Sequence, residues 1–182
     1  DDPLVVTTRR VREALAAAGL FEARPLPFVA GDDATHVRVA NPLAEDEPHL
    51  RTSVLDTLAR RAEYNLARMV GDVRLFEVGS VFAPRPGRAL PDERLAVGAL
   101  VMGARRPPHF TEPRPPAFDA WDAKALAGRA ARAAYPGAAI DLVPVGDGTG
   151  DALWTIAVDG ASLGTVRRVA LDAPVWAAPA FG

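Results

Sequence analysis

The sequence predicts a mixed α+β domain with a largely antiparallel sheet. Three observations lead to this prediction. Three stretches combine helical spacing of apolar residues with a capping residue at their start. Two long apolar stretches, residues 73–82 and 94–103, have the composition of buried strands. Three short strand-like stretches end the chain, and the dipeptide Asp159-Gly160 is expected to join the last two in a tight hairpin.

The boundaries of the first two helices follow from their capping residues. Thr7 or Thr8 is expected to cap a first helix that runs to Ala18, just before a glycine that stops it. Ser53 is expected to cap a second helix, because an aspartate three residues later can complete a capping box. An apolar stripe at helical spacing carries this second helix to Met69.

The third helix is expected to begin after Asp119 and to run to about Tyr135. Its apolar residues Trp121 and Leu126 are expected to point toward the core. Before it, residues 104–117 hold five prolines, which predicts an exposed, partly ordered loop.

The strand at residues 73–82, VRLFEVGSVF, is apolar on both of its faces. We therefore expect it to be central in the sheet and covered on both sides. Glu77 shares one face with Leu75 and Val81. A lone buried carboxylate is costly, so Glu77 must be paired or must face a cleft.

The composition excludes several classes of function. The chain has no cysteine, which excludes thiol catalysis, disulfides and cysteine-based zinc sites. His36, His49 and His109 lack the short spacing of metal ligands, so we expect no metal site. A net charge of −2 does not indicate a nucleic-acid partner, and no apolar run is long enough to cross a membrane. The start of the chain does not resemble a signal peptide. The absence of cysteine fits a reducing cytoplasm, where we expect the protein.

Other candidate motifs favour ordinary structure. The glycine-rich stretch at residues 146–151 precedes a strand rather than a helix, so a hairpin loop is favoured over a phosphate cradle. Paired acidic residues such as Glu45 and Glu47 lie in expected loops, where solvent surrounds both carboxylates. The residues alone therefore predict no catalytic constellation, and we assign none.

One block of the sequence is more informative than its composition. Between residues 38 and 82, short motifs follow one another in a specific order and at specific spacing. The residues in these motifs are Asn41, Pro42, Arg51, Thr52, Ser53, Asn65, Arg68, Phe76, Glu77 and Gly79. The block closely resembles the synthetase-like core of the beta chain of bacterial phenylalanine–tRNA ligase.

This resemblance implies the antiparallel sheet with flanking helices of class II aminoacyl-tRNA synthetases. In that family an alpha chain carries the active site, and the beta chain holds a copy of the fold that has lost catalysis. Class II catalysis needs an arginine on a strand to hold the ATP phosphates. Here Arg85 and Arg88 lie in a Pro/Gly-rich loop instead. We therefore interpret the strand at residues 73–82 as part of a scaffold and not of an active site. Glu77 is expected to pair with an arginine, with Arg51 as the first candidate, and so to fix the sheet to a helix.

We interpret residues 1–182 as one synthetase-like domain, a fragment of a longer beta chain, that is inactive alone. Its expected role is to hold the alpha chain in a heterotetramer of two alpha and two beta chains. ATP and magnesium then belong to the holoenzyme, which also binds tRNA, and the fragment itself holds no cofactor. The alternative is a degenerate synthetase fold that keeps a small-molecule or nucleotide pocket near Arg51 and Glu77.

Overall fold

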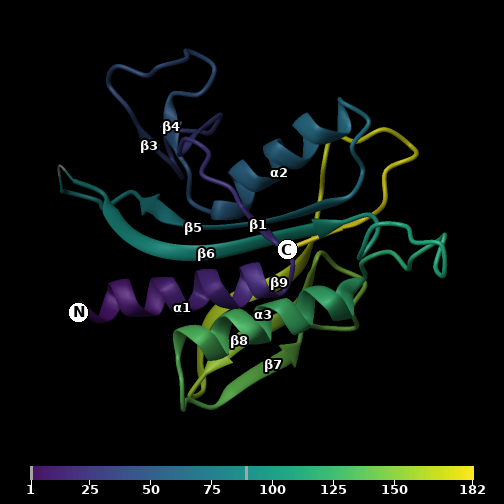
Figure 1. Cartoon of the computed structure of the whole chain (residues 1–182). Helices are drawn as coiled ribbons and strands as arrows, with labels where there is room; N and C mark the ends of the chain where they lie inside the picture. Colours follow the sequence, from purple (N-terminus) through teal and green to yellow (C-terminus); the bar gives the residue numbers. More distant parts are fainter. Residues whose placement is uncertain (1, 89) are drawn as a thin grey trace.

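The structure is a computed structural model that describes residues 2–88 and 90–182. Within these residues, three helices lie against a long sheet (Figure 1). The helices are α1 (Pro3–Ala17), α2 (Val54–Leu66) and α3 (Ala120–Ala134). The strands are β1 (Phe21–Glu22), β2 (Phe28–Val29), β3 (Val37–Arg38), β4 (His49–Leu50), β5 (Val73–Ala83), β6 (Asp92–Met102), β7 (Ile140–Pro144), β8 (Ala152–Val158), β9 (Ala161–Val169) and β10 (Ala180–Phe181).

Seven strands form one sheet in the order β1-β5-β6-β10-β9-β8-β7. Adjacent strands are antiparallel except β1, which pairs with β5 in parallel. The longest pairing joins β5 and β6, from Val73 opposite Met102 to Ala83 opposite Asp92. The remaining strands form a small sheet in the order β2-β4-β3. This architecture confirms the predicted α+β class with a largely antiparallel sheet.

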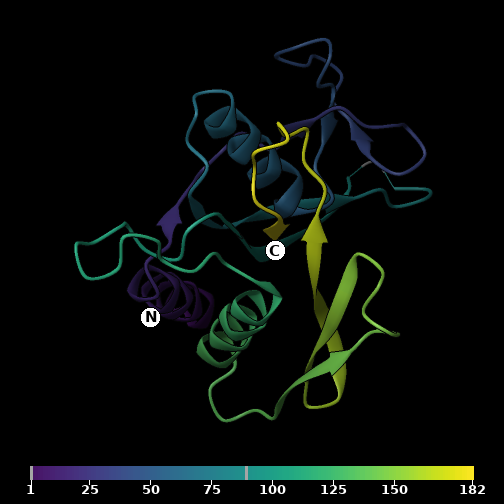
Figure 2. The same cartoon turned by 90° about the vertical axis from the view of Figure 1, so that its right-hand side faces the viewer.

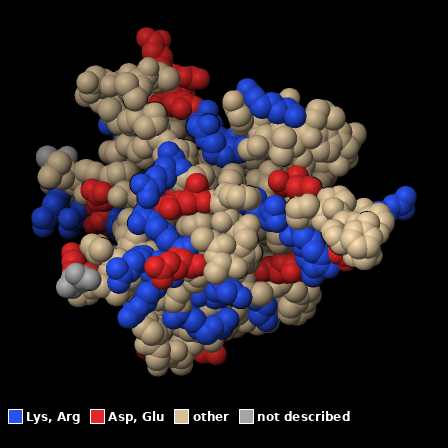
Figure 3. Space-filling model, viewed as in Figure 1, with Lys and Arg blue, Asp and Glu red and all other residues tan. Residues whose placement is uncertain are grey.

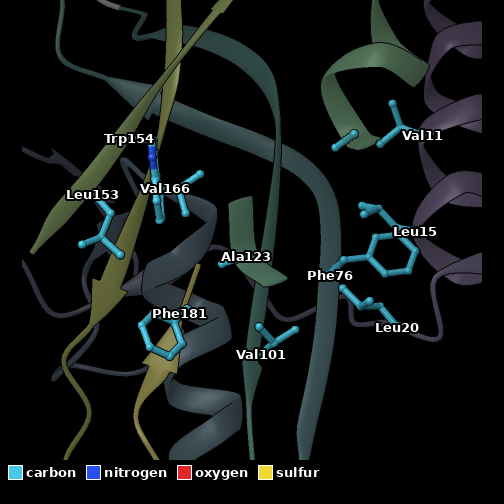
Figure 4. Packing of buried hydrophobic residues seen from close by; sticks show 11 residues of the cluster. Val11, Leu15, Leu20, Phe76, Val101, Ala123, Leu153, Trp154, Val166 and Phe181 are labelled. Atoms are coloured by element: carbon cyan, nitrogen blue, oxygen red, sulfur yellow. The ribbon is translucent and has the colours of Figure 1, made fainter. Parts of the chain in front are cut away.

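Helices cover both faces of the sheet where β5 and β6 run, as Figures 1 and 2 show. Helix α2 lies on one face, where Val73 and Val81 of β5 are buried. Helices α1 and α3 lie on the other face, where Phe76 packs beside Leu15 and Leu20 (Figure 4). Each large apolar side chain buried in this way contributes about 1.5–3 kcal/mol to folding. The prediction that this strand is covered on both sides is confirmed.

Several local predictions are also confirmed. Ser53 caps α2 and Asp119 caps α3, each in a full capping box. Leu126 packs against the core. The turn between β8 and β9 has positive φ at both central residues, 49° at Asp159 and 81° at Gly160. Two such residues fit the tight hairpin turn that matches the twist of the strands.

Two helix ends differ from the prediction. Helix α1 begins at Pro3, earlier than a cap at Thr7 or Thr8 allows, because Asp2 caps it and proline is favoured in the first helical turn. Helix α2 ends before Met69, because Met69 takes a left-handed φ of 62°. A left-handed residue satisfies the last helical carbonyls but stops the helix.

Two predictions about position were wrong. Trp121, in the first turn of α3, is 66% exposed, and the centroid of its ring lies 5.3 Å from that of Trp154. Strand β5 is not central, because its outer neighbour β1 extends along only two residues, opposite Leu75 and Phe76. Farther along, the segment after β4 takes the place of a strand, and the Phe82 N–H donates to Arg51 O at 3.0 Å.

Candidate functional site: a buried ion pair between sheet and helix

Arg51 and Glu77 form an ion pair between α2 and the sheet, and their exposed fractions are 2% and 4%. Arg51 Nη2 donates to Glu77 Oε1 at 2.6 Å, and Arg51 Nη1 donates to Glu77 Oε2 at 2.8 Å. Two parallel bonds of this kind make the strongest arginine–carboxylate geometry. The expected pairing of Glu77 with Arg51 is confirmed.

The remaining donors of Arg51 extend the pair into three segments. Its Nε donates to the Ser80 carbonyl of β5 at 3.0 Å, and its Nη1 also donates to Thr57 Oγ1 of α2 at 2.6 Å. The Arg51 N–H donates to Pro27 O at 2.9 Å, beside β2. One side chain and its own backbone therefore connect the small sheet, the long sheet and α2.

Gly79 lies against the ion pair, two residues after Glu77 on the same face of β5. A Cβ atom at this position would overlap both Glu77 Oε1 and Arg51 Nη2. The backbone of Gly79 does not have positive φ. The position therefore requires glycine for space and not for conformation.

The side chains of Arg51 and Glu77 are buried and bond mainly to each other. Both oxygens of Glu77 accept from Arg51, and the guanidinium also bonds to β5 and α2. A buried charge that lost its partner would be left uncompensated, which costs several kcal/mol. The geometry is suited to holding α2 on the sheet.

The other residues of the family motif are distributed around this pair. Ser53 caps α2, and Thr52 beside it is exposed. Phe76 lies on the opposite face of β5 in the core. Asn41 and Pro42 lie in the turn after β3, away from the pair.

Asn65 and Arg68 belong to the end of α2. The Asn65 side chain donates to Arg61 O at 2.7 Å. The backbone carbonyl of Asn65 accepts from Val70 N at 3.0 Å. Arg68 lies over the Tyr64 ring, 3.4 Å from its centroid. These two residues close the helix and do not contact the ion pair.

Sequence reasoning missed Thr57 and the Ser80 carbonyl. Thr57 is 3% exposed and lies one turn into α2, on the face that also carries Leu58. Its polar side chain among buried apolar neighbours was the available signal, because such a hydroxyl needs a partner. A backbone carbonyl such as that of Ser80 has no signal in a sequence.

A second buried polar group lies in the small sheet. His49 is 3% exposed, and its Nε2 lies 2.7 Å from Asp33 Oδ1. This hydrogen bond, with Arg38 adding to it, holds the pKa of Asp33 below its usual value. Within residues 2–88 and 90–182, no three His, Asp or Glu side chains gather as metal ligands.

Two cavities open on the surface of the domain. One, of about 300 Å³, lies between α2 and the loops around Phe28 and Leu43. The other, of about 570 Å³, is a largely apolar groove between α1, α3 and β6. Arg51 and Glu77 themselves line neither cavity, but Thr57, which accepts from Arg51 Nη1, lines the smaller one.

The other sites that the sequence singled out lie in loops between strands. Arg85 and Arg88 lie in the loop between β5 and β6, as expected. Residues 146–151 form the loop between β7 and β8. In the part of the chain that the structure describes, each helix is too short or too polar to span a bilayer.

Comparison with known proteins gives one consistent family. Residues 2–144 match the family described as the CLM domain of the phenylalanyl tRNA synthetase beta chain. The phenylalanine–tRNA ligase beta subunit of Novosphingobium aromaticivorans is 35% identical over 150 residues, which cover 79% of this chain and 18% of that protein. The corresponding subunit of Geobacillus kaustophilus is 33% identical over 158 residues, covering 78% and 20%. The chain thus spans about a fifth of the length of these relatives.

Solved structures show the same fold. Two structures of pyrrolysyl-tRNA synthetase from Desulfitobacterium hafniense superpose with TM-scores of 0.66 and 0.64. Each covers 98% of this chain and 64% of the synthetase at 14% sequence identity. The seven-stranded sheet with its helices is therefore the class II synthetase fold, as the sequence predicted.

Proposed function

The chain belongs to the family of phenylalanyl-tRNA synthetase beta chains, and from this premise we propose that it holds a catalytic alpha chain in the active ligase. Residues 1–182 form one synthetase-like domain for this purpose and catalyse no step themselves. The observation that carries the proposal is the buried Arg51–Glu77 pair, in which the guanidinium bonds to Glu77, to Thr57 and to the Ser80 carbonyl.

The proposal assigns the chemistry to the partner. The alpha chain binds ATP, magnesium and phenylalanine, and two alpha and two beta chains together present tRNA to that site. The beta chain provides structural support. Its sheet is fixed to α2 by the ion pair and to α1 and α3 by the apolar core. Translation places this assembly in the cytoplasm.

We expect this chain alone to show no phenylalanine-dependent exchange of pyrophosphate with ATP. Its melting temperature should stay within about 1 °C when magnesium-ATP and phenylalanine are added, because a ligand raises stability only when it binds the folded form. A ligand present at a hundred times its Kd would add about 2.7 kcal/mol, which is several degrees for a domain of this size.

The assembled ligase of alpha and full-length beta chains, measured in the same buffers, is the positive control for both assays. A rise of several degrees for this chain would contradict the proposal and would support the alternative of a retained nucleotide or small-molecule pocket.

A further inference from the structure

Residues 104–117 leave the fold and return to the point at which they left. Phe118 N donates to Gly103 O at 2.8 Å, and Ala104 and Ala117 form an antiparallel bridge. The ends of the loop are already adjacent, so a direct connection between β6 and α3 needs none of the residues between them. Compact loops with adjacent ends, and loops of this length, are often functional.

The base of this loop is fixed to the body of the protein. Gly103 has φ of 75°, and a Cβ atom there would overlap Gly71 O and Asp72. The Asp72 carboxylate accepts from Ala104 N at 2.7 Å. Arg105 donates to Ala117 O at 3.1 Å and pairs with both capping aspartates of α3.

The tip of the loop is also ordered by its own bonds. His109 and Glu112 exchange backbone hydrogen bonds of 3.1 and 2.9 Å around a two-residue turn. Both guanidinium nitrogens Nε and Nη2 of Arg106 bond to the Glu112 carboxylate. Five prolines further restrict the backbone. The loop is therefore a preformed arm and not a flexible connection.

This arm presents an apolar side chain to solvent. Phe110 lies in the two-residue turn at the tip and is 86% exposed, with His109 against its ring at a centroid distance of 4.2 Å. Figure 3 shows the arm as a projection at the right of the view, mostly tan and with a basic group at its outer end. Ordering a loop costs backbone entropy for each residue. The Phe110 ring offsets little of this cost within the chain, because it buries little apolar surface there.

The charges of the arm indicate which class of partner it can bind. Three arginines and one glutamate give it a net charge of +2, in a chain whose net charge is −2. Arg105 and Arg106 are paired within the fold, whereas Arg114 has no ion pair with any residue in the described part of the chain. A polyanion needs several free cations along its backbone. One free arginine and one exposed aromatic ring on the same arm fit a protein surface better than RNA.

We propose that residues 104–117 are a docking arm whose Phe110 ring enters an apolar pocket of the partner polypeptide, with a carboxylate at the rim facing Arg114. Preformed aromatic anchors that fill a pocket contribute much of the affinity of an interface, because little ordering remains to be done on binding. The identification of this partner as the alpha chain rests on the proposed function.

The test uses the full-length beta chain that contains this sequence, together with its alpha chain. Phe110→Ala is expected to weaken the association at least tenfold, and Phe110→Leu less. The melting temperature of the free beta chain should not change, because Phe110 is exposed in it. Leu43→Ala is the matched control, since Leu43 is 77% exposed in another loop, and it should leave the affinity within about twofold. Arg114→Glu should slow association and reduce its salt dependence.

The outcomes distinguish a failure of the docking arm from a failure of the proposed function. Wild-type affinity for Phe110→Ala overturns the docking arm while leaving the scaffold role intact. Unchanged subunit affinity with a raised KM for tRNA also overturns it and assigns the arm to RNA. A wild-type beta chain that does not bind the alpha chain at all overturns the proposed function, and the arm's assignment to that partner with it.

Discussion

Glu77→Gln is expected to destabilise the domain by about 3–5 kcal/mol in denaturant unfolding, because it leaves the Arg51 guanidinium buried without a counter-charge. Glutamine keeps the shape and one acceptor, so the loss reports charge rather than volume. A loss of this size is a large fraction of the stability of a domain.

Glu93→Gln is the matched control for this substitution. Glu93 lies on the neighbouring strand β6, is exposed, and accepts from Ser80 Oγ at 2.7 Å. Its neutralisation should change the unfolding free energy by no more than about 0.5 kcal/mol. Equal effects for the two substitutions would contradict a structural role for the pair.

A double substitution measures the coupling itself. Arg51→Met with Glu77→Leu should cost less than the sum of the two single changes, because neither variant side chain leaves a buried charge behind. Additive losses would mean that the pair contributes packing alone.

Gly79→Ala is expected to destabilise the domain by about 3 kcal/mol or more, since its Cβ forces Glu77 and Arg51 apart. The change adds one methyl group to a strand, where alanine otherwise costs nothing relative to glycine. Because the overlap falls on the ion pair, Gly79→Ala in the Arg51→Met, Glu77→Leu background should lose much less.

Gly164→Ala on β9 provides the comparison. An added Cβ there meets Ile156 Cδ1 at 3.4 Å, an ordinary contact, so stability should stay within about 0.5 kcal/mol. Similar unfolding midpoints for Gly79→Ala and Gly164→Ala would show that β5 shifts without strain and would remove the spatial argument for Gly79.

Local signals in the sequence predicted local structure well. Ser53 and Asp119 marked the caps of α2 and α3, and the aspartate three residues after Ser53 marked its capping box, since such a box depends on residues in a single turn. The same holds for the hairpin at Asp159-Gly160, whose two positive φ angles suit these residue types.

Errors arose where two local signals competed. Thr7 and Thr8 are good caps, but Asp2 followed by proline is also one, and the choice depends on where the helix packs. The apolar stripe continued to Met69, yet the chain turns away there because Met69 adopts the left-handed conformation. Nothing in residue type alone favours methionine for that conformation.

The candidate site shows the limit of reasoning from sequence. A carboxylate on an apolar face must have a partner, and this requirement led from Glu77 to Arg51 across 26 residues. The donors and acceptors that complete the site, at Thr57 and at the Ser80 carbonyl, depend on how α2 lies on the sheet. The short parallel pairing of β1 with β5 depends on the same long-range packing.

The most direct test of the account is to mix this chain with the alpha chain of a phenylalanine–tRNA ligase and to measure the mass in solution. The scaffold role predicts a stoichiometric complex, formed by the wild-type chain and weakened in Gly79→Ala. A folded chain that stays at its own mass of 19.2 kDa when the alpha chain is in excess would contradict it.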